Sequence, residues 1–144
     1  RTDLFKHLEE TSFHLYPILS GTALLSKDVT VFRGSESNGY PMLRNPFRID
    51  VISCAAVTRH QREGLSSDEY ERLTEDNIKA ILLTFDESKC DVLVLSAFGC
   101  GAFGNRPEFM AKTFRNVMKC NRYYKQFCFF PFCFNAFGFI FFCK

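Results

Sequence analysis

The feature that most constrains this chain is the glycine-rich loop Gly99-Cys100-Gly101-Ala102-Phe103-Gly104-Asn105, which follows a continuous apolar run. The run, Asp91 to Phe98, suits a strand that is buried on both faces of an α/β sheet. Pro107 is tolerated in a first helical turn, so we expect a helix to begin there. Backbone N–H groups of glycines and of a helix start can together bind a phosphate. A tight strand-to-helix turn without any ligand is the alternative.

The residues before the loop predict two strands and a helix. Asp28 to Arg33 alternates and is rich in β-branched residues, and Phe47 to Ala56 is a second apolar run, so both are expected to be strands. Ser66 with Glu69 matches a capping box that opens a helix. Its expected buried stripe comprises Tyr70, Leu73, Ile78, Ile81, Leu82 and Phe85.

The segments between and after these elements are assigned with the same rules. The segments 16–26 and 34–46 contain Pro and Gly and are expected to be loops. The segment 2–15 is weakly helical, and 126–130 could form one more strand. The helix after the loop is expected to end near Asn121 and to bury Met110, Phe114, Val117 and Met118. This order of strands and helices predicts an α/β layer architecture.

Two familiar nucleotide-binding motifs fit the loop poorly. Gly99 to Gly104 matches G-x-G-x-x-G, but a dinucleotide fold needs an acid about 20 residues later. No Asp or Glu occurs after Glu108. No Gly-Lys-Ser/Thr follows the glycines either, which excludes a P-loop. The Rossmann interpretation is therefore kept only as a minor alternative.

The segment from Val92 to Pro107, Val-Leu-Val-Leu-Ser-Ala-Phe-Gly-Cys-Gly-Ala-Phe-Gly-Asn-Arg-Pro, resembles the phosphate loop of the microbial-type poly(ADP-ribose) glycohydrolase-like family. Asp28 to Gly34 and Ile49 to Ala56 resemble two preceding strand motifs of that family, in the same order. The resemblance covers about Asp3 to Tyr124 and implies a macrodomain fold. The expected fold class is thus a truncated three-layer α/β/α mixed sheet. The macrodomain-like, partial ADP-ribose-binding domain would span residues 1–126.

The resemblance also implies a ligand and a site. ADP-ribose, free or attached to a protein, is the implied partner, and no cofactor or metal is implied. The glycine loop would wrap the diphosphate, with Phe103 near the distal ribose, and the end of the second strand would line the cleft floor. The implied binding residues are Ser53, Cys54, Ala55, Ala56, Gly99, Cys100, Gly101, Ala102, Phe103, Gly104 and Asn105.

Catalysis is where this chain departs from the family. Members hydrolyse glycosidic bonds of ADP-ribose with a glycine-rich stretch followed by Gln-Glu-Glu, which lies upstream of the first strand used here. Glu9-Glu10 lacks those glycines, so we expect no catalytic residue in this fragment and regard the two acids as solvated. After Ala56 the chain continues as Val57-Thr58-Arg59-His60, where the family usually shows a Pro-Asn pair. The chain is therefore predicted to bind ADP-ribose without hydrolysing it; an intact hydrolase and a purely binding module remain the two hypotheses.

The remaining features bear on the compartment and on the tail. The chain has seven Cys, no CxxC pair and no signal peptide, which favours reduced thiols and an intracellular location. The net charge of +2 gives no reason to predict nucleic-acid binding. A Cys100–His nucleophile is a minor alternative, although His7, His14 and His60 all lie upstream.

The segment 127–144 forms a Phe-rich tail that is distinct from the domain. Nine of the 18 Phe lie in it, and it holds Pro131, Asn135 and Gly138. Only its first four residues suit a strand, so we expect the rest to be non-native or disordered and not to pack into the domain. A membrane anchor is the alternative, but the run is at the short limit for a span.

Overall fold

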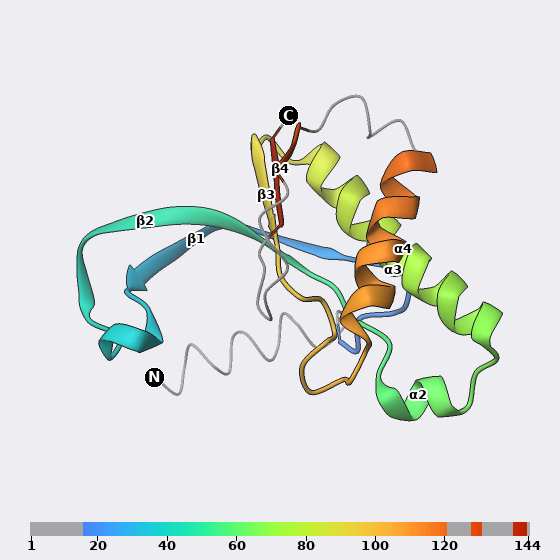
Figure 1. Cartoon of the computed structure of the whole chain (residues 1–144). Coiled ribbons are helices and arrows are strands. Elements are labelled where there is room, and N and C mark those ends of the chain that lie inside the picture. The colour runs from blue at the N-terminus through green and yellow to red at the C-terminus, as the bar shows by residue number, and fades with distance from the viewer. Residues whose placement is uncertain (1–15, 121–127, 131–139, 144) are drawn as a thin grey trace.

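The computed structural model describes residues 16–120, 128–130 and 140–143 (Figure 1). The expected helical segment 2–15 and the residues Glu9, Glu10, His7 and His14 lie outside the described part. In chain order, the elements are β1 (Leu24–Arg33), η1 (Glu36–Asn38), β2 (Met42–Ser53), α2 (Arg59–Glu63), α3 (Ser67–Glu87), β3 (Val92–Leu95), α4 (Pro107–Cys120), β4 (Cys128–Phe130) and β5 (Ile140–Cys143).

The strands form two small antiparallel sheets. β1 and β2 make a long hairpin, and β3, β5 and β4 form a second sheet in that order. Figure 1 shows the hairpin reaching away from α3 and α4, which lie side by side next to β3. The expected α/β class is confirmed at this level: the chain is a mixture of helices and antiparallel strands.

The two long helices begin where the sequence indicated. Ser66 caps α3 by accepting the N–H of Glu69, whose side chain returns to the Ser66 N–H, so the capping box is confirmed. α4 begins at Pro107, as expected, and ends at Cys120, one residue before the expected end. Each helix buries one apolar stripe, as its sequence period requires.

The core lies between these helices and β3. α3 contributes four fully apolar side chains, β3 two and α4 four: Ile78, Ile81, Leu82, Phe85, Leu93, Leu95, Met110, Phe114, Val117 and Met118. Tyr70 and Leu73, which the sequence also placed on the buried stripe, are only half-buried. Phe98 packs edge-on against Phe114, with ring centroids 6.4 Å apart, and so ties the start of the glycine loop to the core.

The expectation that the apolar run 91–98 is a strand buried on both faces is wrong. β3 covers only Val92–Leu95, and its side chains alternate: Leu93 and Leu95 are buried, whereas Val92 and Val94 are 50% and 53% exposed. The physical reason is that α3 and α4 cover one face of this strand. The apolar residues of the run could be buried on both faces of the strand, but only the face with Leu93 and Leu95 is buried.

The expected polar loop 34–46 is also shorter than predicted. β2 begins at Met42, and η1 with Gly39 makes the turn, where Gly39 has φ +72°. Pro46 lies inside β2, where the pairing with β1 is irregular: Val31 faces Phe47 and Arg33 faces Met42. Pro lacks an N–H and is accommodated in such irregular pairing, which is why its presence did not end the strand.

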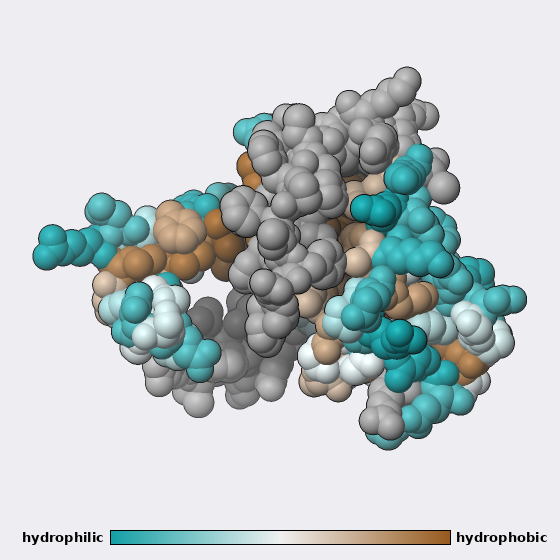
Figure 2. Space-filling view, in the orientation of Figure 1, coloured by the Kyte–Doolittle hydropathy of each residue, from teal (hydrophilic) through white to brown (hydrophobic). Residues whose placement is uncertain are grey.

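The hairpin leaves many apolar side chains on its surface. Phe32, Met42 and Phe47 are each about half or more exposed, at 48%, 65% and 53%. Figure 2 shows hydrophobic residues along this arm, whereas hydrophilic residues gather over the helices. Apolar surface on this scale is typical of faces that contact another molecule.

The tail contributes more to the fold than the sequence indicated. β4 falls in the segment 127–130 that was expected to suit a strand, but β5, at residues 140–143, pairs with both β3 and β4. The sequence did not predict this strand beyond Phe130. The sequence did not indicate this strand because the Phe-rich run lacks the apolar–polar alternation that marks a strand. Among the described helices, none has the length and apolar character needed to cross a membrane.

Candidate functional site

The glycine loop is a compact turn between β3 and α4. The Cys100 N–H donates to the Ala97 carbonyl, the Gly104 N–H to the Gly101 carbonyl, and the Asn105 N–H to the Gly99 carbonyl. Gly99 and Gly104 have φ of +70° and +66°, a region that favours glycine strongly. Two of the three glycines are therefore required by the backbone path itself.

Gly99 also brings the two predicted halves of the site together. A Cβ on Gly99 would overlap the Asn105 side-chain amide and would lie 2.7 Å from the Ala56 methyl carbon. The loop backbone therefore rests directly on the end of the second strand segment. Of the predicted floor residues, Ser53, Cys54 and Ala55 are half-buried and Ala56 is buried. The loop and the end of this segment thus adjoin.

Asn105 is the residue that locks the loop in place. Its side chain is buried, its Nδ2 donates to the Val57 carbonyl at 2.8 Å, and its Oδ1 accepts from the Tyr70 hydroxyl at 2.8 Å. Tyr70 comes from α3 and stacks on Phe109 of α4, with ring centroids 4.7 Å apart. One amide therefore joins the loop, the segment after β2 and both helices.

The tip of the loop presents backbone donors to solvent. Gly101, Ala102 and Phe103 are exposed, and within the described part of the chain none of their N–H groups donates to a backbone or side-chain acceptor. Successive N–H groups left free in a turn can bind an anion. A Cβ on Gly101 would meet nothing within 4 Å, so the space above the tip is open.

Positive charge and a helix start reinforce this arrangement. Arg62 of α2 donates to the Gly104 carbonyl at 3.2 Å and its guanidinium lies 5.8 Å from the centre of the Tyr70 ring. Arg106 is exposed at the beginning of α4, whose first N–H groups carry partial positive charge. The loop is therefore an electropositive turn, apart from Glu108 on the first turn of α4.

The sequence missed Arg62 and Tyr70 as site residues. Arg62 lies on the short helix α2, which Thr58 and Gln61 open with a capping box. That pair was present in the sequence and could have revealed the helix. The segment after Ala56 lacks the Pro-Asn pair of the family that the chain resembles. The Thr58 cap nevertheless gives this segment an ordered turn.

Cys54 does not face the loop as a ligand-binding side chain would. Its Sγ donates to the Asn77 carbonyl of α3 at 3.6 Å. Burial raises the pKa of the Cys54 thiol to about 11, although a backbone bond from Ala55 opposes the rise. The side chain is thus a neutral, inward-facing group.

The structure gives no support for Cys100 as a nucleophile. Burial, followed by the charge of Glu108, raises the pKa of the Cys100 thiol, whereas a reactive cysteine needs a lowered one. The His60 side chain is 97% exposed, and its Nδ1 lies 3.9 Å from a Glu63 carboxylate oxygen. In the described part of the chain, no group of three or more His, Cys, Asp or Glu side chains could hold a metal ion.

The raised pKa of Cys54 predicts a loss of stability in alkaline solution. The unfolded thiol ionises near pH 9, whereas the folded thiol stays protonated up to about pH 11, so stability present below pH 9 is lost as the pH rises toward 11. We expect the free energy of unfolding to fall less over this window in Cys54→Ala than in the original chain. Urea unfolding at pH 8, 9, 10 and 11 measures this; parallel curves for the two proteins would contradict it.

Comparison with known proteins finds no family model, no curated protein and no solved structure that matches the chain.

Proposed function

We propose that this chain is a three-layer macrodomain of the poly(ADP-ribose) glycohydrolase-like type, which binds ADP-ribose without hydrolysing it. The observation that carries the proposal is the loop tip, where the N–H groups of Gly101, Ala102 and Phe103 are exposed and unpaired in the described structure. A diphosphate supplies oxygens that can accept from several such donors at once. The resemblance of residues 92–107 to that family supplies the identity of the nucleotide.

The surroundings of the loop support a nucleoside diphosphate carrying a second sugar. Arg62 and the start of α4 offset the phosphate charge, and the single methyl of Ala56 lets the Gly99 backbone approach the strand end closely. Phe103 is 42% exposed at the tip and offers an apolar ring against which a ribose could rest. This placement of the distal ribose follows the resemblance.

The proposal excludes turnover by the residues described. Glycosidic hydrolysis needs a carboxyl group held against the leaving oxygen. Glu108, on the first turn of α4, is the acid next to the loop, and it is exposed, as expected from its position after Pro107. An exposed carboxyl without a neighbour to orient it does not meet that requirement.

A ligand series tests the proposal. Isothermal titration of the whole chain with ADP-ribose should show binding, with ADP weaker and AMP weakest, since AMP cannot fill the diphosphate position. Ribose 5-phosphate is the matched control for a ligand with one phosphate and no base. Equal affinity for ADP-ribose and AMP would show that the loop does not hold a diphosphate, and failure of ADP-ribose to bind would refute the proposed function.

A further inference from the structure

The hairpin arm of β1 and β2 carries one continuous apolar face. The ladder holds three residue pairs that are spaced two residues apart along β1, and such pairs lie on the same side of a sheet. The pairs are Val29↔Ile49, Val31↔Phe47 and Arg33↔Met42. We call the five apolar members of these pairs, all except Arg33, the ribbon face.

The ribbon face is exposed although it is apolar. Four of its members are between 37% and 65% exposed, and Val31 is half-buried. A two-stranded hairpin on its own is marginally stable, and it gains stability when its apolar face packs against a helix or further strands. Figure 1 shows the arm reaching away from α3 and α4, so these helices do not supply that cover. We therefore expect another surface to cover the ribbon face in solution.

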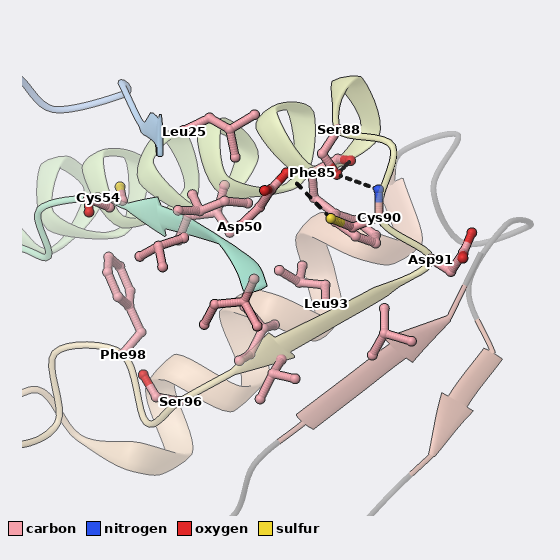
Figure 3. A pocket seen from close by; sticks show the side chains of 18 of the residues that line it. Leu25, Asp50, Cys54, Phe85, Ser88, Cys90, Asp91, Leu93, Ser96 and Phe98 are labelled. Carbon is pink, nitrogen blue, oxygen red and sulfur yellow. Dashed lines mark hydrogen bonds between the residues drawn. The ribbon is translucent and has the colours of Figure 1, made fainter. Parts of the chain in front are cut away.

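The opposite face of the arm is the one that turns toward the rest of the molecule. At the base of the arm, the Cys90 thiol donates to the Asp50 carboxylate at 3.5 Å, as Figure 3 shows. Asp50 follows Ile49 in β2, and side chains alternate across a strand, so Asp50 belongs to the opposite face. Phe32 follows Val31 in β1 and belongs to this face for the same reason. Phe32 is therefore an exposed aromatic residue of the arm that is not part of the ribbon face.

At the tip of the arm, the charge turns away from the ribbon face. Nη1 of Arg33 donates to the Tyr40 carbonyl at 3.0 Å, and the guanidinium lies 5.9 Å from the centre of the Phe32 ring. Because Phe32 belongs to the opposite face, the Arg33 charge is drawn toward that side. Glu36 and Arg44 are also exposed near the tip. The tip therefore carries a net positive charge, while the ribbon face stays apolar.

At the base of the arm, the charges offset one another. Arg48 lies 3.7 Å from an Asp28 carboxylate oxygen. Asp50 accepts from the Cys90 thiol and from the Asp28 N–H, and Lys27 is exposed. Two acids and two bases leave this end neutral. A second arm laid across the first in the reverse direction would place its basic tip over a neutral end and not over another basic tip.

We propose that the ribbon face binds the same face of a second copy of this chain, around a two-fold axis that passes near the middle pair, Val31 and Phe47. The two arms stack face to face and run in opposite directions, so Phe47 of each copy lies against the ribbon face of the other. One patch used by both copies is the usual arrangement of a two-fold dimer, and homodimer interfaces are more apolar than other interfaces. This inference does not depend on ADP-ribose binding at the loop.

The accessible surface of the chain is large enough for such a dimer. The whole chain exposes 11061 Å². A folded monomer of 16.7 kDa is expected to expose only about 7,600 Å². A specific, stable interface buries about 800 Å² on each partner. The surplus of exposed surface therefore exceeds what a dimer needs to bury.

Two other occupants fit the arm less well. An apolar membrane layer would first have to receive the end of the arm, which is the polar turn formed by η1. The acidic helix α3 of another copy could attract the basic tip, since Ser67–Glu87 contains seven Asp and Glu against two Lys and Arg. That attraction would act on the tip charges and would leave the ribbon face uncovered.

Sedimentation velocity of the whole chain over a concentration series tests the proposal. The chain should show a monomer–dimer equilibrium that persists in about 1 M NaCl, because salt screens exposed charges but does not weaken apolar packing. Phe47→Lys places a charge in the middle of the ribbon face and should raise the dimer dissociation constant by about tenfold or more. Phe32→Lys introduces the same charge on the opposite face at a similar exposure, 48% against 53%, and should leave the dimer unchanged.

A second variant covers the case in which the first one does not fold. Both substituted positions are exposed, so circular dichroism should show a retained fold. Met42→Lys changes another member of the ribbon face, which is 65% exposed, and should also weaken the dimer. If Phe47→Lys unfolds, the comparison of Met42→Lys with Phe32→Lys decides the question.

Three results would overturn the proposal. The first is a chain that stays monomeric at every concentration, and binding of that monomer to anionic phospholipid vesicles would show that a lipid surface covers the arm instead. The second is self-association that Phe47→Lys and Phe32→Lys weaken equally, or that neither weakens, which would place the contact on another surface. The third is loss of the dimer in about 1 M NaCl, which would mean that charges and not the ribbon face hold the copies together.

Discussion

Replacing Gly99 by Ala should destabilise the fold by about 2 to 4 kcal/mol, more than any other single methyl group added to a described glycine. Two costs add at this position. The backbone has φ +70°, which costs an L-residue about 1 to 2 kcal/mol. The new Cβ would also overlap the Asn105 amide and approach the Ala56 methyl carbon to 2.7 Å, so buried groups must move.

Gly39→Ala separates these two costs. Gly39 has a similar φ of +72°, but a Cβ there would meet nothing within 4 Å. The control should therefore lose only the backbone part, about 1 to 2 kcal/mol. Urea unfolding of both variants measures the difference. Equal losses for the two variants would show that Gly99 does not lie against Asn105 and Ala56, and the joined site would have to be abandoned.

Replacing Asn105 by Ala should cost about 2 to 3 kcal/mol, because the Val57 carbonyl is left buried without its donor and the Tyr70 hydroxyl without its acceptor. Burial raises the pKa of Tyr70, so its hydroxyl remains a neutral donor through the physiological range. The loop should also lose its fixed shape, since Asn105 joins it to both helices.

Tyr70→Phe is the matched control for this second prediction. It removes one of the two bonds and keeps the ring that stacks on Phe109, so the expected cost is about 1 kcal/mol. Thermal unfolding of the two variants, with proteolysis of the loop as a second readout, measures the effect. A loss in Asn105→Ala no greater than in Tyr70→Phe would mean that the bond to Val57 contributes little.

Local signals in the sequence were sufficient to predict α3, α4 and the loop between β3 and α4. The capping box at Ser66, Pro107 at a helix start and the two apolar stripes each act within a few turns, so they need no knowledge of the rest of the chain. The same holds for β1, β2 and β3, whose existence was predicted from β-branched or apolar runs although their ends were not.

What could not be predicted depends on contacts between distant segments. Val92 and Val94 look as buried in the sequence as Leu93 and Leu95, and only the positions of α3 and α4 decide which pair is covered. The length of the hairpin depends on the pairing of β1 with residues beyond Pro46. The pairing of β5 with β3 joins residues 45 to 51 positions apart in the chain, from Leu95↔Ile140 to Val92↔Cys143.

For the candidate site too, features that depend on nearby residues could be predicted, and those that depend on distant contacts could not. The strand-to-helix loop could be predicted from the sequence, whereas the positive φ and the close contact of Gly99 with Ala56 are seen only in the structure. The sequence did not predict the roles of Asn105, Tyr70 and Arg62, because each acts through a partner 35 or more residues away. Asn105 bonds to Tyr70 and to Val57, and Arg62 bonds to Gly104.

The most direct measurement of the central claim is the affinity of the loop tip for ADP-ribose in Gly101→Asp and Gly101→Ala. A Cβ at Gly101 points into open space, so both variants should fold, and Ala should bind nearly as the original chain does. Asp places a negative charge where the diphosphate would lie and should weaken binding by about a hundredfold or more, since like charges in contact cost several kcal/mol. Calorimetric titration that finds ADP-ribose bound equally well by Gly101→Asp would contradict the account.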